Sequence, residues 1–359
     1  MFDSIKSLIG FRSGSILGVD IGTASIKIVE IVKSSPKPKL KNYGILKTYS
    51  HLERPNSAIQ TNTLKIAEKE TAELLKSLID KAKFKTREAV ASIPFFAAFI
   101  TLLELPIMSD ADITKTMSFQ IKQHIPLPIS EVAIDWLKVG ERKDEEVIKQ
   151  QILLISVPNE IIQRYQNIFR LAGLKLKSLE IESLSLARSL VANDPTPTLL
   201  VDIGARSSNI SIIEGGFLKN NISSDFAGAS LTSAIANGLG IDIKRAEGLK
   251  IQKGLKAGGA EYELSTLPLP YLDAIIGEAT RTKNNFEKNQ GRKIERVLLS
   301  GGGANLSGIE EYCEKQINLP VSIGNSLMRL SYPPEIELLA KELGPEFAVA
   351  IGLAIKEIS

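Results

Sequence analysis

A strand–turn–strand pattern occurs twice in this sequence, as GVDIGTASIK at residues 18–27 and as LVDIGARSSNI at residues 200–210. In each copy an aspartate closes an apolar strand, and a glycine that permits a tight turn follows two positions later. A single hairpin of this kind is ordinary β structure, because aspartate and glycine are common turn residues. The two aspartates are 202 − 20 = 182 residues apart, a separation that favours two duplicated lobes over a short tandem repeat.

The residues of the two hairpins are suited to binding phosphate together with a metal ion. A carboxylate such as Asp20 or Asp202 can hold a hydrated Mg²⁺, which prefers oxygen ligands and keeps several of its waters. Backbone N–H groups of the turns can point at phosphate oxygens. In the first copy Ser25 adds a hydroxyl and Lys27 a positive charge. The pair of hairpins therefore predicts a magnesium–phosphate site, with both aspartates binding the metal through water.

A third segment, LLSGGGANLSGI at residues 298–309, places three glycines after an apolar strand. Bare backbone at such a turn lets a flat or anionic ligand approach closely. A purely structural glycine turn is the alternative. Leu306 stands where a dinucleotide-binding fingerprint needs glycine, and the sequence contains no P-loop motif, so neither of those nucleotide-binding classes fits.

Composition excludes several other classes of protein. The 359 residues are 43% hydrophobic and 24% charged, enough for two or more cores, and 44 basic residues are interspersed with 41 acidic ones. Such mixing argues against a nucleic-acid-binding face. The single cysteine, Cys313, fits a reducing compartment, and the widely separated His51 and His124 do not suggest a metal site.

No stretch of the sequence is long and apolar enough to predict a membrane span. The uncharged run at residues 89–103 is interrupted by Pro94, and every uncharged run is shorter than the roughly 20 residues that a bilayer requires. Residues 1–12 combine Phe2, Ile5 and Leu8 with basic residues. They suggest either a packed or frayed terminus or a short amphipathic helix that touches a membrane or partner.

Periodicity predicts a mixed α/β chain. Helices are expected at residues 64–82, 109–125, 159–172, 230–238, 243–253, 271–290 and 347–356. Strands are expected within 15–33 and at 43–49, 89–93, 99–105, 133–139, 151–157, 198–203, 209–213 and 296–300, with a charged loop at 141–149. Ser109 and Asp112 have the spacing of a helix-capping box.

The order of these segments resembles the actin, Hsp70 and sugar-kinase superfamily. In that superfamily a first phosphate hairpin, a connecting helix, a second phosphate hairpin, an adenosine loop and a second connecting helix follow one another. Here they correspond to residues 20–27, 180–190, 202–210, 301–309 and 347–356. The resemblance implies an α/β, actin/Hsp70-like two-lobed ATPase fold that binds ATP and Mg²⁺ between its lobes.

The region at residues 86–173 narrows the resemblance. Its order of strand, strand, helix, strand, strand, helix is similar to the 1C subdomain of the FtsA and PilM families, and unlike the 1B subdomain of actin or MreB. The stretch QHIPLPISEVAIDW at residues 123–136 resembles a PilM motif, although Trp136 has a plain core role as its alternative. FtsA usually continues to a C-terminal membrane helix, so a chain ending at Ser359 favours the PilM family of type IV pilus assembly proteins.

The resemblance also implies subdomain boundaries. Subdomain 1A is expected at 15–85 and 174–196, the 1C insertion at 86–173, subdomain 2A at 197–228 and 292–340, subdomain 2B at 229–291, and the second connecting helix at 341–359.

Site residues follow from matching the superfamily's motifs onto this chain. Glu247 and Lys250 match an adenosine-bordering helix, although their spacing is equally that of a helical surface pair. Gly228 stands where PilM proteins usually have two glycines, but here Ala227 precedes it. The expected nucleotide-binding residues are Asp20, Gly22, Thr23, Ala24, Ser25, Lys27, Asp202, Gly204, Ala205, Arg206, Ser207, Asn209, Gly228, Glu247, Lys250, Gly301, Gly302, Gly303 and Ala304. Glu182 is the candidate catalytic residue, with simple helix capping or solvation as its alternative.

Three functions remain open from the sequence. The resemblance favours an ATP-gated adaptor at the cytoplasmic face of the inner membrane, which binds the N-terminal tail of PilN between subdomains 1A and 1C and is linked through PilN to PilO and PilP. An FtsA-like filament protein is the second possibility, and self-association would accompany it. A true ATPase or kinase is the third, because no residue other than Glu182 suggests a catalytic base.

Overall fold

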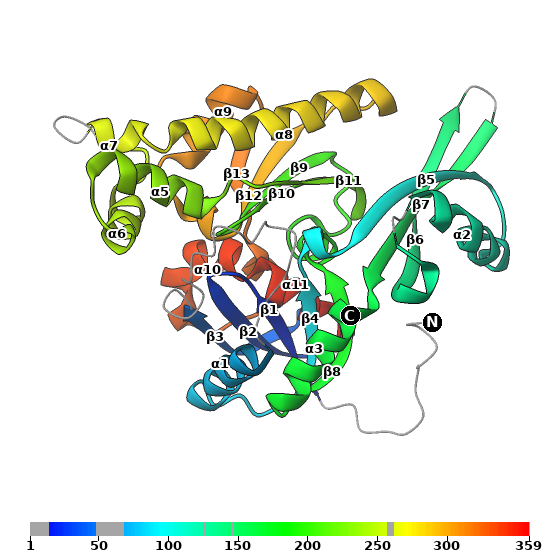
Figure 1. Cartoon of the computed structure of the whole chain (residues 1–359), viewed down its shortest axis with the longest axis horizontal. Coiled ribbons are helices and arrows are strands. Elements are labelled where there is room, and N and C mark those ends of the chain that lie inside the picture. Colours follow the sequence, from blue (N-terminus) through cyan, green and yellow to red (C-terminus); the bar gives the residue numbers. More distant parts are fainter. Residues whose placement is uncertain (1–13, 48–67, 125–126, 145–146, 257–261, 359) are drawn as a thin grey trace.

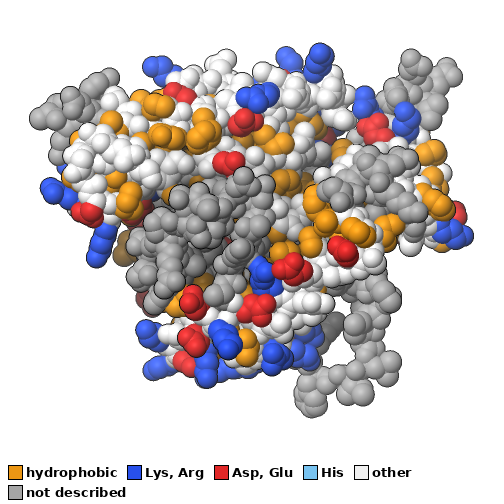
Figure 2. Space-filling model, in the orientation of Figure 1, with side chains coloured by type: hydrophobic (Ala, Val, Ile, Leu, Met, Phe, Trp, Pro, Cys, Tyr) orange, Lys and Arg blue, Asp and Glu red, His pale blue; other side chains and the backbone are white. Residues whose placement is uncertain are grey.

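The computed structural model describes residues 14–47, 68–124, 127–144, 147–256 and 262–358. Figure 1 shows two lobes, each built on a five-stranded sheet, with a smaller three-stranded sheet at one side. Charged side chains of both signs are scattered over the face in Figure 2, as the mixed composition predicts. Within the described part of the chain, no helix is long and apolar enough to cross a membrane.

The first lobe contains sheet A, with strand order β3-β2-β1-β4-β8. Its strands are β1 (Ser15–Ile21), β2 (Ser25–Val32), β3 (Lys39–Lys47), β4 (Glu88–Ile93) and β8 (Lys175–Ile181). The first three strands are an antiparallel meander, and β4 and β8 add in parallel to β1. Val19, Ile28 and Ala91 are fully buried, so both faces of the sheet must be covered.

The second lobe repeats this arrangement strand by strand in sheet C, with order β11-β10-β9-β12-β13. Its strands are β9 (Thr198–Ile203), β10 (Ser208–Glu214), β11 (Phe217–Ser224), β12 (Arg296–Ser300) and β13 (Val321–Ile323). Again the first three are antiparallel and the last two are parallel to the first. The duplication seen in two short motifs therefore extends over both sheets, including β11 and β13, which periodicity did not predict.

Helices cover both sheets and meet between them. In the first lobe α1 (Glu68–Lys81) and α3 (Asn159–Leu171) pack on sheet A. In the second lobe α8 (Leu269–Gln290) and α9 (Ile309–Ile317) pack on sheet C. The remaining helices are α4 (Glu182–Leu186), α5 (Gly228–Leu239), α6 (Ile243–Lys253), α7 (Tyr262–Thr266), α10 (Ala340–Glu346) and α11 (Ala348–Ile358).

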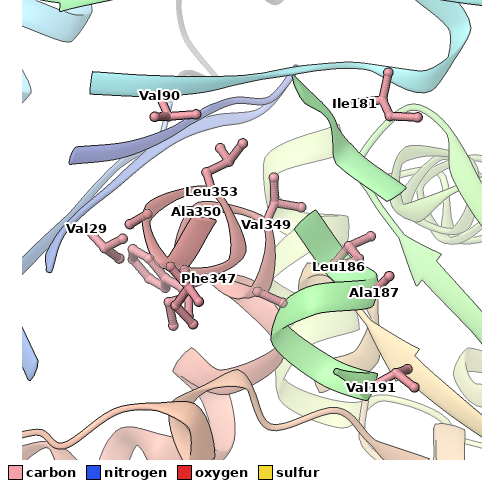
Figure 3. Close-up of a cluster of buried hydrophobic side chains, with 14 of the residues drawn as sticks. Val29, Val90, Ile181, Leu186, Ala187, Val191, Phe347, Val349, Ala350 and Leu353 are labelled. Atoms are coloured by element: carbon pink, nitrogen blue, oxygen red, sulfur yellow. The ribbon is translucent and has the colours of Figure 1, made fainter. Parts of the chain in front are cut away.

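Helix α11 lies in the core between the two sheets. Figure 3 shows its Val349, Ala350 and Leu353 between side chains of sheet A and those of the segment that follows α4. The backbones of β1 and α11 are in direct contact, because a Cβ on Gly18 would lie 1.9 Å from the Ala350 carbonyl oxygen. A Cβ on Gly352 would lie 2.0 Å from the Ser185 carbonyl oxygen. Helices α4 and α11, which join the two lobes, therefore cross with their backbones in van der Waals contact.

The third sheet, sheet B, has the order β5-β7-β6 and lies beside the two lobes. It contains β5 (Phe99–Pro106), β6 (Val132–Asp144) and β7 (Val147–Pro158), with α2 (Asp110–His124) between β5 and β6 in the chain. Sheet B has its own small core with α2. We call residues 99–158 the inserted subdomain. It lies within the 86–173 expected for the insertion; β4, before it, belongs to sheet A, and α3, after it, packs against that sheet.

Some sequence-based boundaries differ from the structure. The charged loop predicted at 141–149 is wrong, since β6 and β7 continue pairing to Asp144 and Val147. Glu141 and Ile148 near this end of the ladder are exposed. Strands that face water tolerate charged residues, so a search for apolar alternation does not find them. The connecting helix begins at Glu182 instead of residue 180, because Glu180 and Ile181 still pair with β4. Residues 1–12 and 64–67 lie outside the described part of the chain.

Candidate nucleotide site

The two hairpin turns have the same construction. The Gly22 N–H donates to the Ser25 carbonyl at 3.0 Å, and the Gly204 N–H donates to the Ser207 carbonyl at 3.1 Å. A Cβ on Gly204 would lie 2.7 Å from that Ser207 oxygen, so the turn closes only around a glycine. Of the other predicted turn residues, Thr23, Ala24, Ser25, Ala205 and Ser207 are partly buried and Arg206 is exposed.

Each aspartate pairs across its hairpin with the residue at the equivalent position of the second strand. Asp20 pairs in register with Lys27, and Asp202 pairs with Asn209. The Lys27 ammonium donates to the Asp20 carboxylate at 3.1 Å. Burial opposes the charge of Lys27, but the carboxylates of Asp20 and Glu346 outweigh it and raise the pKa of Lys27. The first hairpin therefore carries its own ion pair, whereas the second has a carboxylate beside a neutral amide.

A serine from the neighbouring parallel strand binds each aspartate. The Ser92 hydroxyl on β4 donates to Asp20 at 3.2 Å. Ser300 on β12 is in register with Asp202 and hydrogen-bonds to it. Sequence reasoning missed both serines, although each is a small polar residue at the carboxyl end of an apolar strand. Each serine therefore lies beside the aspartate near the end of the neighbouring strand.

Ionisable side chains of the two hairpins interact electrostatically, although the hairpins belong to different lobes. Burial raises the pKa of Asp202 to about 6, against the effects of Lys27 and of the Ser300 hydrogen bond. Burial also raises the pKa of Glu182 well above its usual range, and Asp20 and Asp202 add to that effect. The structure thus brings Asp20, Lys27, Asp202 and Glu182 into one cluster with an excess of negative charge. The Asp20 and Asp202 carboxylates are oxygen donors of the kind that Mg²⁺ prefers, although no group of three or more possible metal ligands lies together among the described residues.

The three glycines after β12 have different surroundings. Gly301 has φ +79°, and a Cβ there would lie 2.9 Å from Asp202 Oδ1. A Cβ on Gly303 would lie 2.3 Å from Ile203 Cγ2, while one on Gly302 would meet nothing within 4 Å. Gly301 and Gly303 are therefore needed to pack the loop against β9. Gly302 is the one of the three whose missing side chain faces open space, and Ala304 behind it is buried.

Helices α5 and α6 hold the second turn from the other side. The N–H groups of Gly228 and Ala229 donate to the carbonyls of Gly204 and Ala205, at 3.0 and 2.8 Å. Lys250 donates to the Gly228 carbonyl at 3.0 Å and forms an ion pair with Glu247 at 2.7 Å. The helical pair that the spacing predicts therefore forms, and both of its side chains are largely buried against the start of α5.

The comparisons with known proteins agree with this geometry. The family model of the type IV pilus assembly protein PilM matches residues 18–358. The chain belongs to the PilM family. Among solved structures, a PilM–PilN type IV pilus biogenesis complex is similar at a TM-score of 0.81, with 23% identity over 96% of this chain and 98% of that one. This structural similarity, together with that to EutJ and MreB5 described next, shows the actin-like fold.

Proteins with lower similarity also match. The ethanolamine utilization protein EutJ of Carboxydothermus hydrogenoformans has a TM-score of 0.58 and 16% identity over 96% of this chain and 92% of that one. MreB5 of Spiroplasma citri bound to AMPPNP has a TM-score of 0.52 and 14% identity, covering 89% and 95%. The cell division protein FtsA of Neisseria meningitidis is 23% identical over 56% of this chain and 53% of its own length. The PilM-family chain thus spans about half the length of the curated relatives it matches.

Proposed function

We propose that this protein binds ATP with Mg²⁺ between the two hairpins and serves as a platform of the type IV pilus assembly machinery. The observation that carries the proposal is the convergence of Asp20 and Lys27 from one lobe with Asp202 from the other. The Gly301–Gly303 loop lies directly against Asp202. Two MreB5 structures that share the fold contain AMPPNP and ADP, which supports a nucleotide as the ligand.

In this proposal each group has a distinct task. Asp20 and Asp202 hold the hydrated Mg²⁺, which neutralises phosphate charge when it is bound. Lys27 contacts a phosphate oxygen, and the turn N–H groups of residues 23–25 and 205–207 surround the phosphates. The open side of Gly302 accommodates the adenosine, bordered by Glu247 and Lys250. Since these groups come from both lobes, the nucleotide stabilises the arrangement in which the lobes are together.

The surroundings of Glu182 favour binding over rapid hydrolysis. A residue that positions and deprotonates an attacking water must be ionised. Burial and the nearby Asp20 and Asp202 carboxylates raise the pKa of Glu182 and favour its neutral form. We therefore assign Glu182 at most a slow hydrolytic role and the protein the role of a nucleotide-gated adaptor.

The partner in this proposal is the N-terminal tail of PilN. The solved complex of the same fold contains PilM with PilN. We place the tail between the first lobe and the inserted subdomain, on the cytoplasmic face of the inner membrane, with PilO and PilP linked indirectly. An extended tail bound in this way would be recognised by main-chain hydrogen bonds and side-chain pockets.

The nucleotide arm of the test uses calorimetric titration with Mg-ATP. Asp20→Asn and Asp202→Asn should each weaken Mg-ATP binding by about tenfold or more, or about 1.4 kcal/mol. Asp135→Asn is the matched control, because Asp135 is exposed on β6. Equal Mg-ATP affinity in all four proteins would refute the assigned site.

The partner arm titrates a PilN tail peptide with and without Mg-ATP. Tighter peptide binding in the presence of Mg-ATP supports the adaptor. The half-length match to FtsA makes a filament protein the alternative. Sedimenting polymers with Mg-ATP, combined with no peptide binding in either state, would favour that alternative.

A further inference from the structure

The inserted subdomain has contacts with both lobes, although the chain connects it to only one. It follows β4 and precedes α3, both of which belong to the first lobe. Its strands β5 and β6 nevertheless approach β11, the edge strand of sheet C in the second lobe. The inserted subdomain is therefore positioned covalently by one lobe and non-covalently by the other.

The contact with the second lobe is made where two strands bulge. On β11 the register with β10 skips Lys219, and on β6 the register with β7 skips Val139. Bulges leave one residue outside the ladder and re-aim its side chain or carbonyl. Here the two bulged residues meet, because the Lys219 ammonium donates to the Val139 carbonyl oxygen. It also donates to Gln151 Oε1 at 2.9 Å.

The surrounding residues are shaped for this lysine. Gly140 has φ +144°, and a Cβ there would lie 2.5 Å from Lys219 Nζ. Gln151 is 3% exposed and donates onward to Gln290, the last residue of α8, at 3.4 Å. Burial lowers the pKa of Lys219, with Glu214 opposing that effect. A cation held by neutral oxygens in this way requires specific geometry, since burying a charge is costly.

Beside this contact the interface is loosely packed. A cavity of about 390 Å³ is lined by Lys219, Gln151, Phe286 and Arg142, among others. Interfaces between domains that are polar and incompletely filled permit relative motion. Apolar side chains also cross the interface, because Val139 and Leu153 share a buried cluster with Leu218. The hydrogen bonds of Lys219 are the polar tie at the edge of that cluster.

We propose that Lys219 couples the inserted subdomain to the second lobe, so that a nucleotide-driven change in the position of that lobe is transmitted to the partner-binding subdomain. The inference rests on the proposed function, and it adds the residue through which the nucleotide state reaches the partner site. Lys219 acts through Val139 and Gln151 and is a positioning residue. It touches neither the nucleotide site residues nor the β4–β5 connection.

The only tryptophan of the chain, Trp136, lies on β6 three residues from Val139 and reports on this strand. The experiment measures Mg-ATP affinity by calorimetry and, in the same full-length protein, the change in Trp136 emission on adding Mg-ATP. Lys219→Met keeps most of the apolar stem and removes the donor. Gly140→Ala displaces the ammonium from the opposite side. Lys288→Met, an exposed lysine on α8, is the matched control.

We expect wild type and Lys288→Met to show the emission change. Lys219→Met and Gly140→Ala should lose it while binding Mg-ATP within about threefold of wild type. A full emission change in Lys219→Met overturns the proposal, as does a wild-type protein that binds Mg-ATP without any change in emission. If wild type does not bind Mg-ATP, the calorimetry shows that the proposed function itself fails, and the coupling falls with it.

Discussion

Gly352 on α11 offers a sharp test of how the lobes are joined. A Cβ at this position would lie 2.0, 2.6 and 2.9 Å from the backbone oxygen, carbon and Cα of Ser185. Backbone atoms cannot rotate away as the end of a side chain can, so α11 and α4 would have to separate. Gly352→Ala therefore forces a shift of the buried helix that both sheets pack against.

Two opposing effects set the magnitude. Replacing glycine by alanine inside a helix favours folding by about 1 kcal/mol. Overpacking a well-packed core costs about 1–3 kcal/mol, and more where backbone must move. Because the nearest contact is 2.0 Å and is to backbone, the cost should prevail. We expect Gly352→Ala to lower the free energy of unfolding by about 2 kcal/mol or more.

Gly277→Ala on α8 is the matched control, since a Cβ there would meet nothing within 4 Å. It should raise the free energy of unfolding by about 0.5–1 kcal/mol through helix propensity alone. Urea denaturation followed by circular dichroism measures both variants, comparing midpoints at a common slope. If Gly352→Ala proves as stable as Gly277→Ala, the reasoning from backbone proximity is refuted.

Three further outcomes are expected. Gly302→Ala should weaken Mg-ATP binding in calorimetry with little change in the urea midpoint, whereas Gly303→Ala should lower the midpoint, because only the second Cβ meets Ile203; the reverse pattern would contradict the assignment of the open side. Arg188→Met removes the paired hydrogen bonds to the buried Glu180 carboxylate, at 2.7 and 2.8 Å, and should cost about 2 kcal/mol in urea denaturation, because Lys356 still pairs with Glu180 at 3.2 Å. Cys313 is buried and its pKa is raised to about 12 by burial, so a thiol reagent at pH 8 should label it only after unfolding, and rapid native labelling would contradict this.

The sequence alone determined the duplicated architecture and the groups that bear the chemistry. Asp20 and Asp202 were recognisable because each closes an apolar strand and precedes a turn glycine, a pattern that depends only on local backbone requirements. Their positions at strand ends and the glycine loop after β12 are as the motifs predict, whereas the register partners Lys27 and Asn209 come from the structure. The nucleotide-binding roles of these residues stay predictions.

Tertiary structure decided what depends on distant segments. Ser92 and Ser300 bind the aspartates only because β4 and β12 lie parallel to β1 and β9, and a sequence pattern does not show which strands become neighbours. The pKa of Glu182 is raised by burial and also by Asp20 and Asp202, which come from different lobes. Lys219 meets Val139 across 80 residues of chain because two bulges face each other, and a bulge in one strand is visible only once its partner strand is in place.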